Sequence, residues 1–437
     1  MKIKFIGATE DVTGSMTLLE CPAGKILIDC GLYQGTDDVV KKNLRPLPFD
    51  PKEIVAIILT HAHLDHSGHI PRLVKLGFRG TIYCTKPTLK LARLIMTDSA
   101  HILEKAENHI LKSFYEMEDV MIATSLFKTK NFHETFEVLG MSISFQPAGH
   151  ILGAASVFIN GEKKIVFSGD VGRFNDPLIN PPDKCPLTDV LVIESTYGGK
   201  IRKGNIEEEL TSFIKKIKKE SKVGIIASFA VARAQLLITL IHKFYQLHPE
   251  EKIRFVIDGP MMTEANKIYK EFSQDTKLPE DLRNALEEVE VIDHVREWDS
   301  LKKKEGPLII ITSSGMVSGG RIWRYLENWQ NDTNACLFLP GYQAIGTAGR
   351  ALSEGKRIIH DEEGKSIHWS GEVLSSQAFS SHADQNELLS WINDIDKNTN
   401  IYLNHGEPSS KELFKEKLIE IGFRNVTIAN NNKEQKL

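Results

Sequence analysis

The first 200 residues of the chain consist mainly of short apolar runs separated by turn residues. Many of these runs are rich in β-branched residues or alternate apolar with polar positions, which is typical of β-strands. The runs are Lys2–Ile6, Met16–Glu20, Lys25–Ile28, Ile54–Leu59, Thr81–Cys84, Ser142–Gln146, Ala155–Ile159, Lys164–Phe167 and Val190–Ile193. One longer stretch, Leu89–Glu118, has apolar residues at helical spacing instead. This part of the chain therefore predicts a β-rich domain with a helical patch.

The pattern changes after Tyr197, where apolar strands and amphipathic helices alternate. We expect helices at Ile206–Ser221, Val231–Leu247 and Thr263–Phe272, and strands at Gly224–Ala227, Arg254–Asp258, Leu308–Thr312 and Ala335–Leu339. Strands that alternate with helices indicate a mostly parallel sheet with both faces covered.

From about Glu372 the chain returns to a strand, a helix, a strand and a last helix. The last three cover Gln385–Ile395, Asn400–Leu403 and Ser409–Ile421. We therefore predict an α/β protein in which an α/β unit over 201–372 is inserted into a first domain. That first domain is formed by residues 1–200 and 373–437.

Composition and charge are those of an ordinary globular protein. Hydrophobic residues make up 41% of the 437 residues, charged residues 26%, and the formal net charge is −4. This balance does not favour a nucleic-acid binder, although a local cationic groove is compatible with it. The five cysteines are scattered and form no C-x-x-C pair, which argues against a disulfide framework. Neither a signal-peptide pattern nor eighteen consecutive apolar residues occurs, so we expect a cytoplasmic protein without a membrane span.

A cluster of metal-ligand residue types follows the apolar run Ile54–Leu59. His61 and His63 are two residues apart, so in extended backbone both imidazoles point to the same side and can reach one cation. Asp65 and His66 lie just beyond, where the chain must turn, and can face a second cation. Zinc favours imidazole nitrogen and carboxylate oxygen. Four such donors at the end of a buried strand therefore indicate a metal site.

Further donors come at the ends of other predicted strands. His150 and Asp170 each follow a strand and a glycine turn. Asp29 also follows a strand, although carboxylates are common there as ordinary turn residues. His69 falls inside a predicted helix over Ser67–Leu76, so we leave it out of the ligand set.

In this order, the donors resemble the successive motifs of the metallo-β-lactamase fold. Later segments resemble its β-CASP branch, which includes ribonuclease J and the nuclease subunit of the eukaryotic pre-mRNA 3′-end cleavage factor. Glu194-Ser-Thr-Tyr-Gly resembles motif A, Phe379-Ser-Ser-His382-Ala-Asp resembles motif B, and Asn404-His405-Gly-Glu resembles motif C. The segments 312–321 and 341–350 agree with the same branch, and the likeness covers nearly the whole chain.

The resemblance implies an αββα metallo-β-lactamase sandwich with an inserted α/β β-CASP domain of mostly parallel sheet. It also implies two Zn²⁺ ions per chain. By this mapping one zinc is held by His61, His63 and His150, and the other by Asp65, His66 and His405. Asp170 bridges both ions, and Asp29 orients the ligands.

The same mapping suggests how a phosphodiester is cleaved. Two cations can activate water and clamp a phosphodiester, and we expect Asp65, Asp170, Glu194 and His382 to carry the catalysis. His382, oriented by Glu194, is the candidate general acid for the leaving 3′-oxygen, because a carboxylate partner keeps an imidazole protonated near neutral pH. The alternative for Glu194 is an ordinary surface carboxylate at a strand end.

The inserted unit is expected to grip RNA through backbone N–H groups after its strands and through arginines. The expected contacts are Ser228, Arg233, Ser313, Ser314, Gly315, Arg321, Arg350 and, beside His382, Ser381. The alternative for most of these positions is structural, with glycines serving turns and arginines bracing the fold.

His405 favours RNA, because in this family a histidine at motif C accompanies RNA substrates and an apolar residue accompanies DNA. A DNA nuclease of the same branch and a non-catalytic scaffold are the alternatives; the filled ligand positions argue against the scaffold. An esterase or glyoxalase-type hydrolase would not need the inserted domain. Motif B favours an endonuclease, with 5′→3′ exonuclease activity as a second mode. We expect single-stranded RNA as the partner and leave a homodimer open.

Overall fold

The computed structural model describes residues 1–35, 39–105, 109–292, 298, 301, 306–344, 346–361 and 364–437. The chain forms two compact units: one contains Met1–Ile201 with Ser381–Leu437, and the other contains Arg202–Ser380. The first unit is therefore built from both ends of the sequence. None of the described helices has both the length and the apolar character needed to cross a bilayer.

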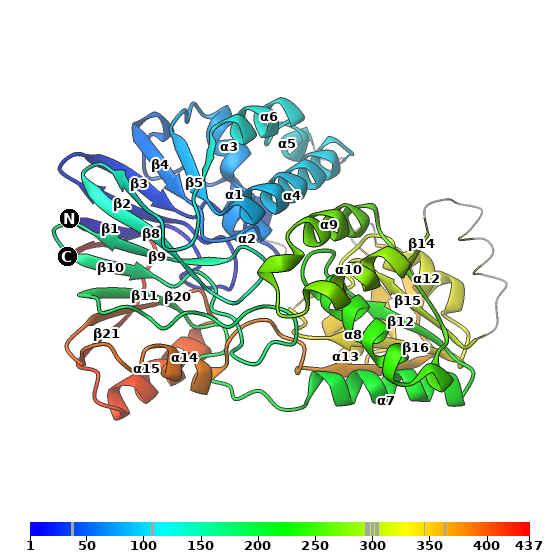
Figure 1. Cartoon of the computed structure of the whole chain (residues 1–437). Coiled ribbons are helices and arrows are strands. Elements are labelled where there is room, and N and C mark those ends of the chain that lie inside the picture. The colour runs from blue at the N-terminus through cyan, green and yellow to red at the C-terminus, as the bar shows by residue number, and fades with distance from the viewer. Residues whose placement is uncertain are drawn as a thin grey trace. The chain divides into compact units, whose positions relative to one another are not determined.

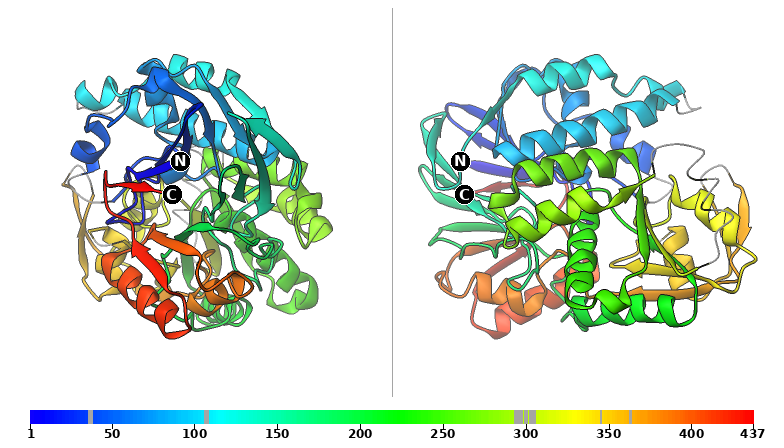
Figure 2. Two further views of the ribbon diagram at one scale, coloured as in Figure 1. Left: turned by 90° about the vertical axis from the view of Figure 1, so that its left-hand side faces the viewer. Right: turned by 45° about the vertical axis from the view of Figure 1, so that its right-hand side comes forward.

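The first unit contains two sheets of seven strands each. The first sheet runs, in spatial order, β22 (Glu434–Lys436), β1 (Lys2–Phe5), β2 (Thr17–Cys21), β3 (Gly24–Ile28), β4 (Ile54–Ile58), β5 (Thr81–Cys84) and β6 (Phe127–Thr129). The second runs β21 (Asn425–Ile428), β20 (Asn400–Asn404), β11 (Val190–Glu194), β10 (Lys164–Phe167), β9 (Ala155–Asn160), β8 (Met141–Pro147) and β7 (Thr135–Val138). Because β1 pairs with β22, the two ends of the chain lie side by side (Figure 2).

Alternate residues of both sheets face a shared core, as the period of two along a strand requires. Ile26 and Ile28 of β3 pack there with Ile143 and Phe145 of β8. The helices and 3₁₀ turns of this unit are α1 (Val39–Leu44), η1 (Pro51–Glu53), α2 (Leu64–Ser67), α3 (Ile70–Lys75), α4 (Lys86–Lys105), α5 (His109–Lys112), α6 (Met117–Ser125), α14 (Gln385–Trp391) and α15 (Pro408–Glu420). Figure 1 shows α3 to α6 over the outer face of the first sheet, and α14 and α15 over the outer face of the second. The layers are thus helix, sheet, sheet, helix, which confirms the predicted αββα sandwich.

The second unit is built on one sheet of six strands in which every neighbouring pair is parallel. Its spatial order is β14 (Glu290–Val291), β13 (Arg254–Asp258), β15 (Leu308–Thr312), β12 (Val223–Ala227), β16 (Ala335–Pro340) and β19 (Glu372–Ser376). Around it lie α7 (Ile206–Lys219), α8 (Arg233–Leu247), η2 (Pro249–Glu251), α9 (Pro260–Glu271), η3 (Ser273–Asp275), α10 (Pro279–Glu288), α12 (Ile322–Trp329), α13 (Ala348–Ser353) and a hairpin of β17 (Ile358–His360) and β18 (Ser366–His368). This arrangement confirms the predicted, mostly parallel sheet.

Both faces of the second unit's sheet are covered, as its continuously apolar strands require. On one face, a side chain at Gly224 would come within 2.7 Å of the Phe213 ring of α7, so the helix lies directly against the strand. On the other face, Ile225 and Ile310 share a core with Trp323 of α12.

Two expectations differ from the structure in detail. The helical pattern over Leu89–Glu118 corresponds to α4, which ends at Lys105, and to shorter helices after it; residues 106–108 are outside the described part. The strand expected at Glu372 is present but pairs with β16, because its backbone completes the edge of the parallel sheet. The second compact unit therefore continues to Ser380, past the boundary expected at residue 372.

Candidate active site

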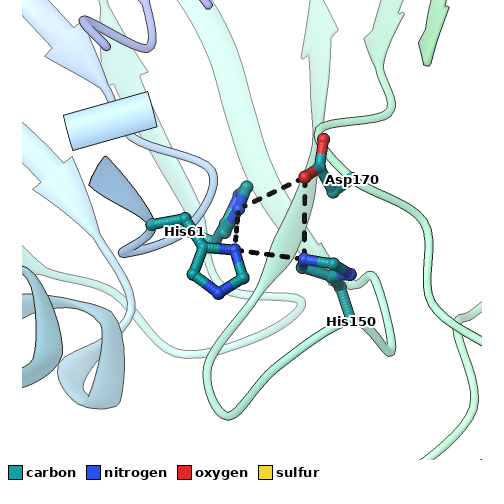
Figure 3. A group of neighbouring side chains, drawn as sticks. His61, His150 and Asp170 are labelled. Atoms are coloured by element: carbon teal, nitrogen blue, oxygen red, sulfur yellow. Dashed lines mark hydrogen bonds and ion pairs between the residues drawn. The ribbon is translucent and has the colours of Figure 1, made fainter. Parts of the chain in front are cut away.

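The predicted metal ligands come together in the first unit because strand ends deliver them to one edge of its two sheets. His61 and His63 follow β4, and Asp65 and His66 lie in α2, a single helical turn directly after them. His150 follows β8, Asp170 follows β10 and His405 follows β20. Figure 3 shows His61, His150 and Asp170 pointing toward one another.

The first group of donors surrounds a small space. Nε2 of His61 lies 3.1 Å from Nδ1 of His63, which in turn lies 3.2 Å from Nε2 of His150. Oδ2 of Asp170 lies 3.5 Å from His61 Nε2 and 3.6 Å from His150 Nε2. Four donors at zinc bond lengths of 2.0–2.1 Å in a tetrahedron would lie about 3.3–3.5 Å apart. The observed separations therefore fit one tetrahedral metal ion.

The second group contains Asp65, His66 and His405 and shares Asp170 with the first. Nε2 of His66 lies 3.1 Å from Nε2 of His405, which lies 3.5 Å from Oδ2 of Asp65. Oδ1 of Asp170 lies 3.3 Å from His66 Nε2 and 3.5 Å from His405 Nδ1. The two carboxylate oxygens of Asp170 thus face different donor groups, as a bridging ligand requires.

The protonation of the first group also fits a metal ion. Burial lowers the pKa of His63 to about 4 and holds the pKa values of His61 and His150 well below their usual range. Neutral imidazoles present the lone pair that a metal needs. Oδ1 of Asp170 is fully buried and accepts no hydrogen bond in the described part of the chain. A buried carboxylate oxygen that accepts no hydrogen bond is costly, and a cation would remove this cost.

Asp29 lies behind the ligands and contacts one of them. Its Oδ2 is 2.7 Å from Nδ1 of His66, and its carboxylate also accepts hydrogen bonds from the backbone and side chain of Thr60. If the Nδ1–H group of His66 donates a hydrogen bond to Asp29, Nε2 of His66 presents its lone pair to the second group. The backbone of Asp29 has φ +59°, and that of His405 has φ +50°. Positive φ values away from glycine are strained and concentrate at functional sites.

Glu194 and His382 form a pair beside the metal ligands. Oε1 of Glu194, the last residue of β11, lies 3.1 Å from Nδ1 of His382 and accepts a 2.8 Å hydrogen bond from the backbone of Val171. The Glu194 side chain is fully buried, whereas that of His382 is 19% exposed and can be reached by a substrate. Burial lowers the pKa of His382, but the carboxylates of Glu194 and Asp170 outweigh it, so that the pKa lies above its usual value.

Several supporting residues were not predicted from the sequence. The Thr196 hydroxyl lies 3.2 Å from Nδ1 of His405, and the Ser168 hydroxyl accepts a hydrogen bond from the backbone of Glu194. Thr196 stands inside motif A, so its position in the motif was an available signal. His69, which was left out of the ligand set, belongs to neither donor group: it is buried edge-on against the Phe114 ring, and burial lowers its pKa to about 3.

In the second unit, two of the predicted RNA-binding segments are adjacent. Ser228 follows β12 and the segment Ser313–Gly315 follows β15, its parallel neighbour. A side chain at Gly315 would come within 2.9 Å of the backbone nitrogen of Phe229, so the two turns pack backbone to backbone. Within the described residues, the backbone N–H groups of Ser314 and Gly315 donate no hydrogen bond to a protein group. Ser381 belongs to the other unit, next to His382, and is half-buried.

The three arginines predicted to bind phosphate each contact a protein group. Arg321 is paired with the buried carboxylate of Asp258, Arg350 with Glu354 at 2.5 Å, and Arg233 donates to the carbonyl of Pro340. Arg321 and Arg233 each join two elements of the second unit, as the structural alternative for the arginines expects, whereas the Arg350 pair lies within α13 and its C-terminal cap.

Comparisons with known proteins agree with this architecture. Family descriptions match at residues 9–220 (metallo-β-lactamase superfamily), 234–352 (Beta-Casp domain) and 367–428 (Zn-dependent metallo-hydrolase RNA specificity domain). Ribonuclease TTHA0252 of Thermus thermophilus is 31% identical over 98% of this chain and 98% of its own length. An RNase J-like protein of Methanocaldococcus jannaschii is 32% identical over 93% of this chain and 92% of its own length. A solved structure of a protein of unknown function from Enterococcus faecalis V583 has a TM-score of 0.56 and 13% identity, covering 100% of this chain and 99% of its own, and so shares the fold.

Proposed function

Because the chain belongs to the β-CASP branch of the metallo-β-lactamase superfamily, we propose that it is a ribonuclease with two zinc ions that cleaves single-stranded RNA internally. The observation that carries the proposal is the pair of donor groups sharing Asp170, with the buried Glu194 and the accessible His382 beside them. The superfamily fold implies metal ions; zinc, and two ions, are proposed from the donor chemistry, which is imidazole nitrogen and carboxylate oxygen.

His61, His63 and His150 would hold one ion, Asp65, His66 and His405 the other, and Asp170 would contact both. Two such ions lower the pKa of water and offset negative charge on a bound phosphodiester. Asp29 and Thr196 keep the rings of His66 and His405 in place through the contacts described above. These contacts hold the ring nitrogens of His66 and His405 toward the metal position before substrate binds.

His382 serves as the proton donor. Its Nδ1 faces Glu194, so Nε2, on the opposite edge of the ring, is the nitrogen that meets the substrate. In the hydrolysis, the oxygen of water forms a new bond to phosphorus, the phosphorus–oxygen bond to the 3′-oxygen breaks, and His382 gives the 3′-oxygen its proton. A neighbouring carboxylate favours the protonated ring, so the acid is ready near neutral pH. Ser381, adjacent in sequence, is proposed to contact the same phosphate.

RNA is the proposed substrate for two reasons. Residues 367–428, most of which belong to the first unit, match a family described as an RNA specificity domain. Two relatives that match 98% and 93% of this chain are described as a ribonuclease and an RNase J-like protein. In the second unit, the backbone N–H groups of Ser314 and Gly315 donate to no protein group within the described residues, and they are the proposed donors to a backbone phosphate. Ser228, on the turn packed against them, is proposed to lie beside the same phosphate, although its own N–H and hydroxyl already donate to Thr312 and Phe229. Backbone contacts of this kind carry no base preference.

Internal cleavage is proposed because motif B, 379–384, resembles that of the cleavage-factor type. The test uses one RNA oligonucleotide labelled at either end and carrying a 5′-monophosphate or a 5′-triphosphate. Fragments from internal positions with both 5′ ends are expected, and a chelator should abolish them until zinc is returned. Mononucleotides released only from 5′-monophosphate RNA would replace the endonuclease proposal with an exonuclease. If the protein binds two zinc ions and still cleaves no RNA, the proposed ribonuclease function is refuted.

A further inference from the structure

Lys411 is a buried charge outside both donor groups. It lies in the first turn of α15, and its side chain is 1% exposed. Its ammonium donates to the backbone carbonyl of Thr9, which is far away in sequence. Burial lowers the pKa of Lys411 to about 8, although Glu10, Asp11 and Glu412 act in the opposite direction. A lysine is rarely buried so completely, and the free-energy cost calls for a specific role.

The carbonyl of Thr9 belongs to the segment from Gly7 to Ser15, which connects β1 to β2 and is called here the 7–15 loop. This loop holds the end of β20 through three hydrogen bonds. The backbone of His405 donates to Ala8 at 2.8 Å, that of Gly406 donates to Asp11 at 3.1 Å, and the Asn404 side chain donates to Gly7 at 3.3 Å. The loop therefore supports the strained backbone from which His405 extends.

The other end of the same loop holds Asp65. The backbone N–H of Ser15 donates to the carbonyl of Asp65 at 2.7 Å. Asp65 and His405 come from different sheets, and the 7–15 loop is the one segment that hydrogen-bonds to the backbone of both, within the described residues. In that same part of the chain, no hydrogen bond or ion pair joins the loop to His61, His63 or His150.

We infer that Lys411 is a positioning residue for the second donor group: by anchoring the 7–15 loop it fixes the distance between Asp65 and His405 and so sets the affinity of that group alone for its metal ion. The inference rests on the proposed two-metal function. Removing a group that orients metal ligands weakens metal affinity by about 10- to 100-fold. Loss of the Lys411 ammonium should have an effect of this size on one zinc equivalent and leave the other unchanged.

The experiment titrates zinc into metal-free protein in competition with a chromophoric chelator. Wild type is expected to show two equivalents, and Lys411→Met one unchanged and one weakened by about 10- to 100-fold. Two further variants, each with one donor group disabled, show which group loses zinc affinity when Lys411 is replaced. With His405→Ala, which disables the second group, adding Lys411→Met should leave the remaining equivalent as it was. With His150→Ala, which disables the first group, it should weaken the remaining one.

Two matched controls separate the ammonium from the general effect of a substitution. Lys415→Met removes a half-buried lysine from the same helix, for which no hydrogen bond or ion pair is found among the described residues, and Thr9→Val keeps the carbonyl that Lys411 uses. Both should bind zinc as wild type does. If Lys411→Met does not fold, Lys42→Met replaces it. That variant removes the 3.3 Å ion pair to Asp11 of the 7–15 loop, and a partly exposed pair of this kind should change the same equivalent by about 2- to 5-fold.

The outcomes separate this inference from the proposed function. Unchanged affinities in Lys411→Met and Lys42→Met, with two equivalents in wild type, would overturn the role of Lys411 only. Equal weakening of both equivalents would also overturn it, because a general loss of structure would then explain the result. A wild type with fewer than two equivalents would refute the two-zinc function itself.

Discussion

Replacing His382 by alanine should remove the proton donor and leave the metal ligands in place. General acid catalysis contributes about 10²- to 10⁴-fold to rate, or about 3–5 kcal/mol of transition-state stabilisation. The upper part of this range is expected here, because a fully buried carboxylate of Glu194 lies 3.1 Å from Nδ1 of His382 and raises the pKa of the ring. The alkoxide leaving group of natural RNA depends on that proton.

The assay compares two oligonucleotides that differ in one atom. In the second, sulfur replaces the bridging 3′-oxygen at the cleavage site, so the leaving group is a thiolate that needs no proton. In single-turnover cleavage, His382→Ala should lose about 10²- to 10⁴-fold on the oxygen substrate and less than about 10-fold on the sulfur substrate. Glu194→Gln keeps the shape of the pair but removes the negative charge of Glu194. Its cleavage rate on the oxygen substrate should fall by less than that of His382→Ala, and the sulfur substrate should again largely restore the rate.

Equal losses on the two substrates would refute the reasoning. His382 would then act in binding or in holding the site together, and the general acid would have to be sought elsewhere. Zinc titration of the variant provides the control, since both equivalents should remain bound.

Three further changes test other parts of the structure. Arg321→Met leaves the buried carboxylate of Asp258 without its cation and should lower the free energy of unfolding in urea by about 3–5 kcal/mol; normal stability with weakened RNA binding would instead make Arg321 a phosphate ligand. Gly315→Ala places a methyl group 2.9 Å from the backbone nitrogen of Phe229 and should raise KM for RNA while sparing hydrolysis of a small nitrophenyl phosphodiester; equal loss on both would contradict the proposed phosphate contact. The pKa of Lys411 falls from 10.5 to about 8 on folding, so its cost is fully present below pH 8 and fades as the pH rises toward 10.5. In urea unfolding without metal, the free energy of unfolding of wild type should therefore rise by about 2.5 kcal/mol relative to that of Lys411→Met between pH 7 and pH 10. A difference that stays constant over this range would exclude this titration.

The sequence predicted those parts of the site whose signal is local. His61 and His63 are visible because they stand two residues apart after an apolar run, and Asp170 because it follows a strand. The β-CASP sheet was predicted for the same reason: its strands are apolar throughout and separated by amphipathic helices.

Contacts between segments that are distant in the chain could not be predicted from the sequence. The N–H groups at Ser314 depend on how two turns pack, which residue types do not reveal. The sequence around Arg321 does not distinguish an arginine that binds phosphate from one that pairs with Asp258. Lys411 is an even clearer case, since lysine at a helix start predicts an exposed side chain. Only the approach of the 7–15 loop explains why it is buried.

The first unit is assembled from both ends of the chain, and this has a consequence for synthesis. When the first 380 residues have been made, the first donor group and the residues of the second unit are present, but neither His382 nor His405 has been added. Up to that point β11 also lacks its neighbour β20. At that stage the nascent protein lacks both the proposed proton donor and one donor of the proposed second metal group. Cleavage activity should therefore appear only after residues 381–437 have folded onto the first unit.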